Sequence, residues 1–441
     1  MAKGLRKLPI AFGERHLTHF AGMALVHAFC QQLGLKRLLQ RCLRPAPRAR
    51  AYQPAELVLA LLYAIIGGLD RLNATKILQY NGAFQRIVGL PRFPDASTLR
   101  RFLRRLRPRH VRQLGRLHDR LRQALFARPR PRTSLVFDVD SVVLVVYGHA
   151  EGARVGYNPK KRGRRSYHPL LCFEAHRQEF WHGSLRPGNT VAATGAVPFL
   201  RRCLAKVPPG IARSRIRVRA DSGFFGNRVP EFLEGAGVGY AIVAKEHKLI
   251  KAAAQGCRFR QLGSGWEVGE FRYQAGTWPR ARRFVVVRRP IPSDPIEAKQ
   301  LTLFKDRKYA YHVLVTNLRT RPWRVWRFYA QRARIEQHIR ELLYDYPLAK
   351  IPTADWVANV AFFQLLLFAF DLIHYFRRLC LPPAYQTKTL KTVRMELLII
   401  PGRLVKAKNR YCLRLPDGYH FESAFRHALG KIGKLRPVEI P

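Results

Sequence analysis

Acidic residues are scarce in this sequence. It contains 28 Asp and Glu against 80 Lys and Arg among 441 residues, which gives a formal net charge of +52. Such an excess of one sign repels itself in a compact fold unless an acidic partner neutralises it. Nucleic acid is the expected partner, and an anionic membrane surface is the alternative.

Cysteine is also scarce and shows no pattern. The seven cysteines are odd in number and form no Cys-x2-Cys pair. A zinc site and a disulfide framework are therefore both unsupported, and we expect reduced, buried thiols. The hydrophobic content of 47% excludes a disordered basic chain and is sufficient for real cores.

Long hydrophobic runs free of polar residues are missing as well. The first residues, "MAKGLRKLPIAFGERH", contain no apolar run of the kind found in a signal peptide. The most apolar stretch, residues 356–376, carries Asn359, Gln364, Asp371 and His374 within about 140° of one another on a helix. This pattern predicts a buried amphipathic helix. We therefore expect no membrane association and a cytoplasmic location.

A helix with one apolar and one basic side is predicted near residue 100. In "STLRRFLRRLRP" the apolar residues recur with helical spacing and leave the arginines on the other side. This arrangement is typical of a helix that reads DNA, although a solvated basic helix remains an equal alternative for any single arginine. The expected DNA-facing residues are Arg100, Arg101, Arg104 and Arg105.

Two carboxylates lie close together on a predicted buried strand. In "SLVFDVDSVVLVVY", Asp138 and Asp140 are two residues apart, so both side chains point to one face of the strand. Burying two carboxylates on one face is costly without a compensating charge. A divalent metal ion would supply that charge, and either aspartate is a candidate ligand.

Two further acids stand on other predicted elements. Asp221 in "RIRVRADSGFFG" follows a strand, at the position where α/β sheets place their ligands. Glu336 lies in "FYAQRARIEQHIRELLYDY", and one helix would put Tyr329, Arg332 and Glu336 on one face. Each motif alone is commonly a turn, a cap or an intrahelical ion pair. Together they form an all-oxygen ligand set that suits Mg²⁺ or Mn²⁺, with two ions for phosphoryl transfer.

A basic loop is predicted close to the first catalytic strand. The segment "NPKKRGRRSYH" suits contact with a phosphate backbone, and a solvated run of charge is the alternative. The expected DNA-binding residues in this loop are Lys160, Lys161, Arg162, Arg164 and Arg165.

These segments together resemble bacterial insertion-sequence transposases of the DDE type, in the group with a Tyr-x2-Arg-x3-Glu signature. The insertion-sequence-1380 family is the nearest match. The segments that carry the resemblance are "FDVDSVV", "GYNPKKRGRRSYHPLL", "LRPGNT", "RADSGFF", "LVTNL", "YAQRARIEQHIREL" and "ANVAFFQLLLFAFDLIHYF". The resemblance implies a catalytic triad of Asp140, Asp221 and Glu336. Asp140 is preferred to Asp138 because the hydroxyl residue Ser141 follows it.

The resemblance also implies roles for residues near Glu336. Tyr329 and Arg332 match the signature and are expected at the DNA. Leu343 stands where the family usually has a lysine, and Arg340, one turn after Glu336, is expected to supply that charge.

The implied function is a DNA transposase that performs metal-dependent cleavage and strand transfer at insertion-sequence ends, in a cut-and-paste mode. The alternatives are a ribonuclease-H-like nuclease without strand transfer and a non-enzymatic DNA-binding regulator. The implied partners are the terminal inverted repeats and target DNA, both double-stranded. A homodimer on DNA is expected because transposition joins two ends.

The expected fold is α/β, with a ribonuclease-H-like mixed-sheet catalytic core, a β-rich insertion and a preceding all-helical DNA-binding region. The predicted boundaries are 1–130 for the helical region, 131–246 for the first part of the core, 247–307 for the insertion, 308–380 for the rest of the core with the glutamate helix, and 381–441 for a basic C-terminal region.

Overall fold

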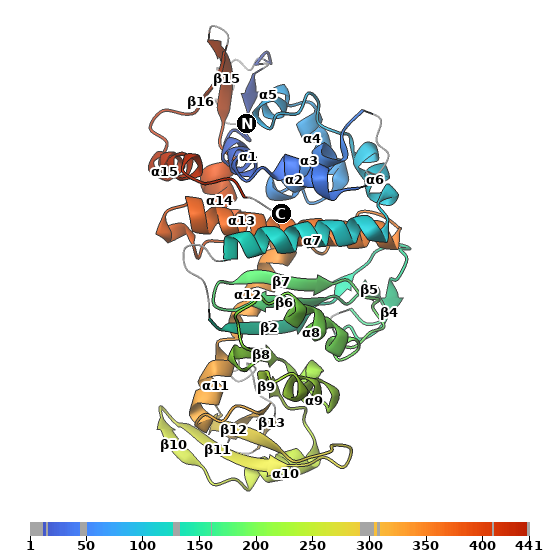
Figure 1. The fold of residues 1–441 in the computed structure, drawn as a ribbon, viewed down its shortest axis with the longest axis vertical. Coiled ribbons are helices and arrows are strands. Elements are labelled where there is room, and N and C mark those ends of the chain that lie inside the picture. Colours follow the sequence, from blue (N-terminus) through green and yellow to red (C-terminus); the bar gives the residue numbers. More distant parts are fainter. Residues whose placement is uncertain are drawn as a thin grey trace, which may run out of the picture. The chain divides into compact units, whose positions relative to one another are not determined.

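The chain forms two compact units, one of which is built from both ends of the sequence. One unit comprises Met1–Leu121 and Tyr344–Pro441, and the other comprises Arg122–Leu343. This division differs from the predicted boundaries, because residues 344–380 belong with the N-terminal helices and not with the catalytic core. The computed structural model describes residues 12–14, 16–44, 51–126, 133–159, 161–291, 304–306, 309–407 and 410–438 (Figure 1).

The terminal unit is mainly helical. Helix α3 (Pro54–Ile66) begins with a capping box between Gln53 and Glu56 and has Pro54 at its first position, as the sequence indicates. The other N-terminal elements are β1 (Leu17–Thr18), α1 (Met23–Gln32), α2 (Leu35–Cys42), η2 (Leu72–Thr75), α4 (Lys76–Gln79), α5 (Gly82–Ile87), α6 (Ala96–Arg105) and α7 (Pro108–Phe126). The C-terminal elements are α13 (Trp356–Cys380), η6 (Pro383–Tyr385), α14 (Leu390–Val393), η7 (Arg394–Leu398), β15 (Gly402–Ala407), β16 (Arg410–Arg414) and α15 (Glu422–Gly433).

Helix α13 is the central helix of this unit, and it packs against α3, α6 and α15. Its polar residues have partners inside the unit. Asp371 lies 2.7 Å from His118 Nε2, and the Gln364 amide lies 3.1 Å from Nδ1 of the same ring. Asn359 donates to the Thr353 carbonyl. The helix is long and apolar enough to cross a membrane, but 78% of its most apolar window is buried within the protein.

The central unit contains the mixed sheet. The strands β7 (Glu179–Ser184), β6 (Leu170–Glu174), β2 (Leu135–Ser141), β8 (Ile216–Ala220) and β9 (Gly239–Val243) lie side by side in this order. β2, β8 and β9 are parallel, whereas β6 is antiparallel to both of its neighbours. This order and these directions are those of a ribonuclease-H-like core, which confirms the predicted fold class (Figure 1).

The inserted strands continue the same sheet. β14 (Tyr309–Thr316) pairs with β9, and β12 (Arg282–Pro290), β11 (Trp266–Tyr273) and β10 (Arg260–Gly263) follow in antiparallel order. β13 (Phe304–Lys305) pairs with β14. The segment begins with a helix, α10 (Lys248–Gln255). The predicted β-rich segment therefore extends the core sheet, which has ten strands among the residues that the structure describes.

Helices cover both faces of the sheet. On one face, α8 (Ala196–Ala205), α9 (Arg228–Gly235) and α10 pack on an apolar core that includes Phe137 and Val139 of β2. On the other face lies α11 (Pro322–Ala330), through Val325 and Tyr329. Helix α12 (Ala333–Tyr344) covers this second face near β6, where His338 stacks on Phe173. The two carboxylates of β2 alternate with Phe137 and Val139, so they point to the second face.

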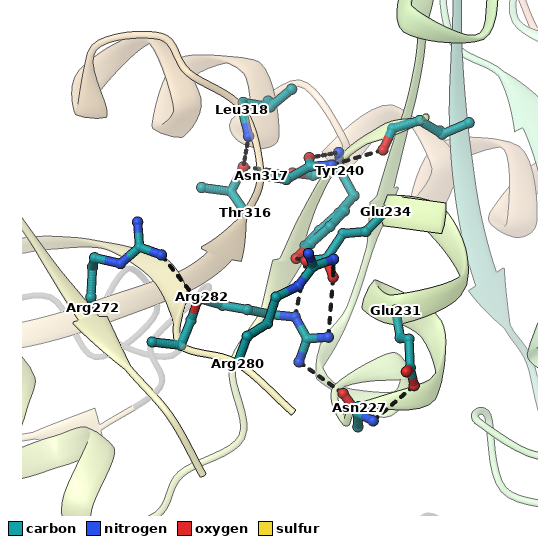
Figure 2. Close-up of polar contacts among 12 residues, drawn as sticks. Asn227, Glu231, Glu234, Tyr240, Arg272, Arg280, Arg282, Thr316, Asn317 and Leu318 are labelled. Carbon is teal, nitrogen blue, oxygen red and sulfur yellow. Dashed lines mark hydrogen bonds and ion pairs between the residues drawn. The ribbon is translucent and has the colours of Figure 1, made fainter. Parts of the chain in front are cut away.

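A polar network joins the inserted strands to the core. Glu234 of α9 accepts hydrogen bonds from the Tyr240 hydroxyl at 2.7 Å, from Arg280 at 2.7 Å and from Arg282 at 3.0 Å. Figure 2 shows these side chains converging on Glu234, with Asn317 beside Tyr240. The Asn317 side chain accepts from the Tyr240 backbone at 2.8 Å. The start of β12 is thereby fixed to both α9 and β9.

Candidate active site

Asp140 and Asp221 come together at one edge of the sheet. β2 and β8 are parallel neighbours in which Val139 pairs with Ala220, so the residues that follow these two positions lie side by side. Burial, and then the negative charge of Asp140, raise the pKa of Asp221 to about 6, although Arg332 acts in the opposite direction. The predicted approach of these two carboxylates is thus present in the structure.

Arg332 holds Asp140. Its Nη2 lies 2.8 Å from Asp140 Oδ2 and also donates to the Val139 carbonyl at 3.3 Å. Burial alone would lower the pKa of Arg332, but Asp140 and Tyr329 outweigh this effect, and the pKa of Arg332 is raised. Arg332 is therefore a buried cation beside Asp140, which differs from its predicted place at the DNA.

Tyr329 is also an interior residue. It is 3% exposed and belongs to the apolar cluster between α11 and the sheet. Burial raises the pKa of its hydroxyl to about 12. Tyr329 and Arg332 were both expected to contact DNA, but a buried side chain cannot reach a phosphate backbone. Both residues therefore stabilise the site from the protein interior.

The helix predicted to carry the signature is broken. α11 ends at Ala330 and α12 begins at Ala333, and the Arg332 N–H donates to the Tyr329 carbonyl at 2.8 Å in a tight turn. Tyr329, Arg332 and Glu336 consequently do not share one helix face. The sequence has neither Pro nor Gly at this point. The break places Arg332 where its side chain reaches the end of β2.

Glu336 stands apart from the two aspartates. It lies in the first turn of α12, its side chain is exposed, and none of the described residues forms a hydrogen bond or ion pair with it. Across the described parts of the chain, no three His, Cys, Asp or Glu residues gather closely enough to hold a metal ion. The structure thus brings together two of the three predicted catalytic carboxylates.

The pair of aspartates nevertheless fits a divalent cation. Asp140 raises the pKa of Asp221 because two carboxylates at one edge repel each other, and a cation with oxygen ligands relieves this repulsion. Ser222 and Gly223 follow in a short turn in which Asp221 accepts the Gly223 N–H at 3.0 Å. This bond orients the carboxylate at the end of β8.

Asp138 has a different role from the one allowed by the sequence. Its two oxygens accept from Arg219 Nε at 2.6 Å and Nη2 at 2.7 Å, and both side chains are 2% exposed. Arg219 also donates to the Phe328 carbonyl at 2.6 Å. The charge that compensates Asp138 is therefore an arginine, and both carboxylate oxygens of Asp138 are occupied by this partner.

His168 positions the residue after Asp140. Burial lowers the pKa of His168, which favours the neutral ring, and Nδ1–H donates to the Thr190 carbonyl at 2.6 Å because a carbonyl oxygen only accepts. Nε2 then accepts from the Ser141 hydroxyl at 3.0 Å. The Ser141 N–H in turn donates to Asp140 at 2.7 Å. The sequence left His168 ambiguous, and the structure gives it a positioning role.

The segment "LRPGNT" packs closely behind this site. Arg186 Nε donates to the His168 carbonyl at 2.8 Å. Gly188 fits because it lacks a Cβ: a Cβ atom there would lie 2.1 Å from the Ser166 carbonyl oxygen and 2.4 Å from that of Arg154. The segment therefore supports the end of β2 that carries Asp140, through close packing and a hydrogen bond.

The predicted basic loop is exposed in the structure. Lys161, Arg162 and Arg164 are exposed, and Arg165 begins β5 (Arg165–Tyr167), which pairs with β3 (Leu144–Val145) and β4 (Arg154–Val155) in a small separate sheet. Lys161 Nζ lies 2.7 Å from the Tyr147 hydroxyl. Lys160 lies outside the described residues.

The predicted basic helix is α6. It begins as expected, with Asp95 accepting the Thr98 N–H at 2.6 Å. Leu99, Phe102 and Leu103 are buried, whereas Arg101, Arg104 and Arg105 are exposed and Arg100 is half-buried. Arg100 donates to Asn73 and Arg104 pairs with Asp355 at 2.9 Å. In α12, Arg340 is exposed.

Two basic residues of the site were missed in the sequence. Arg219 stands two residues before Asp221, and its pairing with Asp138 follows from the alignment of β2 and β8, which the sequence does not specify. Lys245, just after β9, is exposed and lowers the pKa of Asp221 by its charge. Its position after a third parallel strand was the available signal.

A sequence model of the family described as Transposase DDE domain group 1 matches residues 2–437. The chain belongs to this family. It is a DNA transposase, an enzyme of DNA cleavage and transfer, and transposases of the DDE type generally use divalent metal ions. No curated protein matches the sequence.

The solved structures that are similar to this transposase include three transposase complexes. A piggyBac transposase synaptic complex with hairpin DNA is 11% identical with a TM-score of 0.40, over 97% of this chain and 89% of that one. The Mos1 transposase paired-end complex with left transposon end is 12% identical with a TM-score of 0.18, over 44% and 59%. The Drosophila P element transposase strand transfer complex is 11% identical with a TM-score of 0.24, over 49% and 46%.

Proposed function

We propose that this transposase performs metal-dependent cleavage and strand transfer at the ends of a bacterial insertion sequence, in a cut-and-paste mode. Its signature segments favour the insertion-sequence-1380 family. Asp140, Asp221 and Glu336 are the proposed catalytic carboxylates. The observation that carries the proposal is the electrostatic interaction of Asp140 with Asp221 at the ends of two neighbouring parallel strands.

Asp140 and Asp221 are the residues that would hold a divalent ion, with Glu336 as the third ligand. Mg²⁺ is the proposed cofactor, replaceable by Mn²⁺, and a pair of bound ions would supply activation of the attacking hydroxyl and stabilisation of the leaving oxygen. Glu336 lies in the first turn of α12, close to the helix break, and we propose that it joins the aspartates when DNA is bound. Arg332 and Ser141 hold the Asp140 carboxylate in place through their hydrogen bonds.

The proposed partners follow from the reaction and from the charge of +52. They are the double-stranded terminal inverted repeats, the target DNA and a second copy of the chain, since two ends have to be joined. We propose action in the bacterial cytoplasm without membrane association. Exposed cations of α6, Arg340 and the loop at Lys161–Arg165 are proposed DNA contacts, because arginine and lysine bind phosphate.

The decisive experiment replaces each carboxylate separately. Asp140→Ala, Asp221→Ala and Glu336→Ala should reduce Mg²⁺-dependent cleavage of end DNA to background. DNA affinity should be unchanged or slightly higher, because less negative charge faces the phosphates. Glu231→Ala, an exposed carboxylate of α9, is the matched control. Wild-type cleavage by any two of the three variants would overturn the assignment.

A second assay separates the transposase from the two alternatives. Pre-cleaved end DNA is incubated with an unrelated plasmid, and covalent joining is measured. A nuclease without strand transfer would cleave the ends but form no joined product. A DNA-binding regulator would bind the end DNA but would neither cleave it nor form a joined product.

A further inference from the structure

The central unit contains a second basic site at the opposite end of its parallel strands. A pocket of about 530 Å³ lies between α11 and the sheet, where Val136 of β2 and Arg217 of β8 line it. Asp140 lies four residues further along β2, which is roughly 13 Å at the rise of an extended strand. The pocket is therefore separate from the edge that carries the catalytic carboxylates.

The pocket is lined by cations without acidic partners. In the part of the chain that the structure describes, Arg217, Arg324, Arg327 and Arg334 form no ion pair, and no carboxylate lines the pocket. Another lining arginine, Arg219, is neutralised by Asp138. Four like charges around one cavity repel one another, and an anionic ligand would relieve this repulsion.

Aromatic rings hold several of these arginines in place. The guanidinium carbons of Arg324 and Arg327 lie 5.4 and 5.6 Å from the centre of the Trp323 ring. Arg217 lies 5.6 Å from the centre of the Phe328 ring. A ring attracts a cation and orients it without neutralising its charge. The guanidinium groups thus remain available to a ligand in an ordered arrangement.

We propose that this pocket binds phosphate groups of DNA, as a site separate from the catalytic carboxylates. The inference rests on the proposed action on DNA. Guanidinium groups match the geometry of phosphate oxygens and stay charged at all physiological pH values. A small polyphosphate offers the same chemistry, so the test distinguishes the two sources.

The first experiment measures the salt dependence of duplex binding by the full-length protein. In Arg324→Ala/Arg327→Ala, two exposed cations of the pocket are lost. The slope of log affinity against log salt should become shallower by about 1.8, since each lost phosphate contact removes about 0.9. The matched control, Arg201→Ala/Arg202→Ala, removes two exposed arginines of α8, which packs on the other face of the sheet. Equal slopes for the two double variants would overturn the proposal.

The second experiment detects ligand binding in the pocket by tryptophan fluorescence. Trp323 lines it, so duplex DNA should change the tryptophan fluorescence of the wild type, and Trp323→Phe should lose most of this change. Inorganic tripolyphosphate serves as the alternative probe. A response to tripolyphosphate without a response to duplex DNA would show a small-anion site and overturn the assignment to DNA.

Cleavage assays on the same preparations separate this inference from the proposed function. If the pocket variant cleaves end DNA with Mg²⁺ as the wild type does and its salt slope is unchanged, the pocket is not a DNA-binding site, and the proposed reaction still stands. A shallower slope in a protein that never cleaves end DNA supports the pocket and contradicts the proposed reaction.

Discussion

Arg332 Nη2 lies 2.8 Å from the carboxylate of Asp140. This contact joins the break between α11 and α12 to the end of β2, because Arg332 is one of the two residues between these helices. The ion pair therefore helps to position the start of α12, which carries Glu336. A change in the charge at Asp140 is expected to affect both the aspartate and the start of the glutamate helix.

The ion pair between Asp138 and Arg219 should be important for stability. Asp138→Ala leaves a buried guanidinium without its carboxylate, and we expect a loss of about 3–5 kcal/mol in the free energy of unfolding. Chemical denaturation measures this loss. Asp138→Leu/Arg219→Met replaces both charges by apolar groups and should recover most of it.

Catalysis provides the counter-test for Asp138. Asp138→Asn should reduce DNA cleavage less than Asp140→Asn, because the structure gives Asp138 a protein partner in place of a metal ion. If Asp138→Asn folds with wild-type stability and yet fails to cleave, Asp138 is a ligand and the interpretation above is wrong.

The pH dependence of stability should carry the signature of Asp221. Its folded-state pKa of about 6 exceeds the ordinary value of 3.8, so the native protein binds this proton more tightly than the unfolded chain. Between these two values, the contribution of Asp221 to the free energy of unfolding falls as the pH rises. The difference in unfolding free energy between wild type and Asp221→Asn should therefore decline across this window.

Adding Mg²⁺ at a pH above the pKa of Asp221 tests whether repulsion between Asp140 and Asp221 causes this pH dependence. The cation compensates two ionised carboxylates, so it should raise the melting temperature of the wild type and have little effect on Asp221→Asn. A pH-independent difference between the two proteins, with equal effects of Mg²⁺ on both, would contradict the coupling of Asp140 and Asp221.

Helix α6 should contribute to DNA recognition. Arg101→Ala should weaken binding to DNA; loss of a base contact would cost about 1–3 kcal/mol and relax sequence preference, whereas loss of a phosphate contact would weaken all sequences alike. Salt-titrated binding to specific and scrambled ends separates the two cases. Arg37→Ala, an exposed arginine of α2, is the control. If both variants behave identically, recognition lies elsewhere.

Point variants are preferable to removal of the first 125 residues. α3 and α6 pack on α13, so such a truncation would uncover the central helix of the terminal unit. A loss of binding in the truncated protein would then report unfolding instead of recognition.

The network around Glu234 should stabilise the attachment of the inserted strands. Glu234→Ala leaves Arg282, which is 3% exposed, without its carboxylate, and we expect a loss of about 3–5 kcal/mol in the free energy of unfolding. Arg280→Ala removes an exposed partner of the same glutamate and should cost much less than Glu234→Ala, because exposed ion pairs contribute little to stability. Chemical denaturation of both variants tests the difference. Similar losses would contradict the dominant role of Arg282.

Local patterns predicted much of the fold. The apolar runs around Asp140 and Asp221 form β2 and β8, and the order of strands and helices along the chain indicated a parallel or mixed sheet. The meeting of Asp140 and Asp221 is a consequence of that arrangement. α6 was equally predictable, since Asp95 caps it and its apolar residues recur with helical spacing.

Other features depend on long-range contacts that local patterns do not contain. The break before α12 has no Pro or Gly to indicate it, and it coincides with the ion pair between Arg332 and Asp140. The partner of Asp138 depends on which residue of β8 lies opposite. The helices that pack on α13 determine the unit to which it belongs. The apolar sequence of α13 alone does not show which helices these are.

The composition of the terminal unit has a consequence for synthesis of the chain. Its helices α3 and α6 leave the ribosome before the whole central unit, yet their partner α13 is made after it. More than half of the chain is therefore translated after α3 and before α13, the helix that covers it. During this time the apolar surface of α3 is accessible to chaperones and proteases. A product terminated before residue 344 contains every residue of the central unit but leaves the N-terminal helices permanently without this cover.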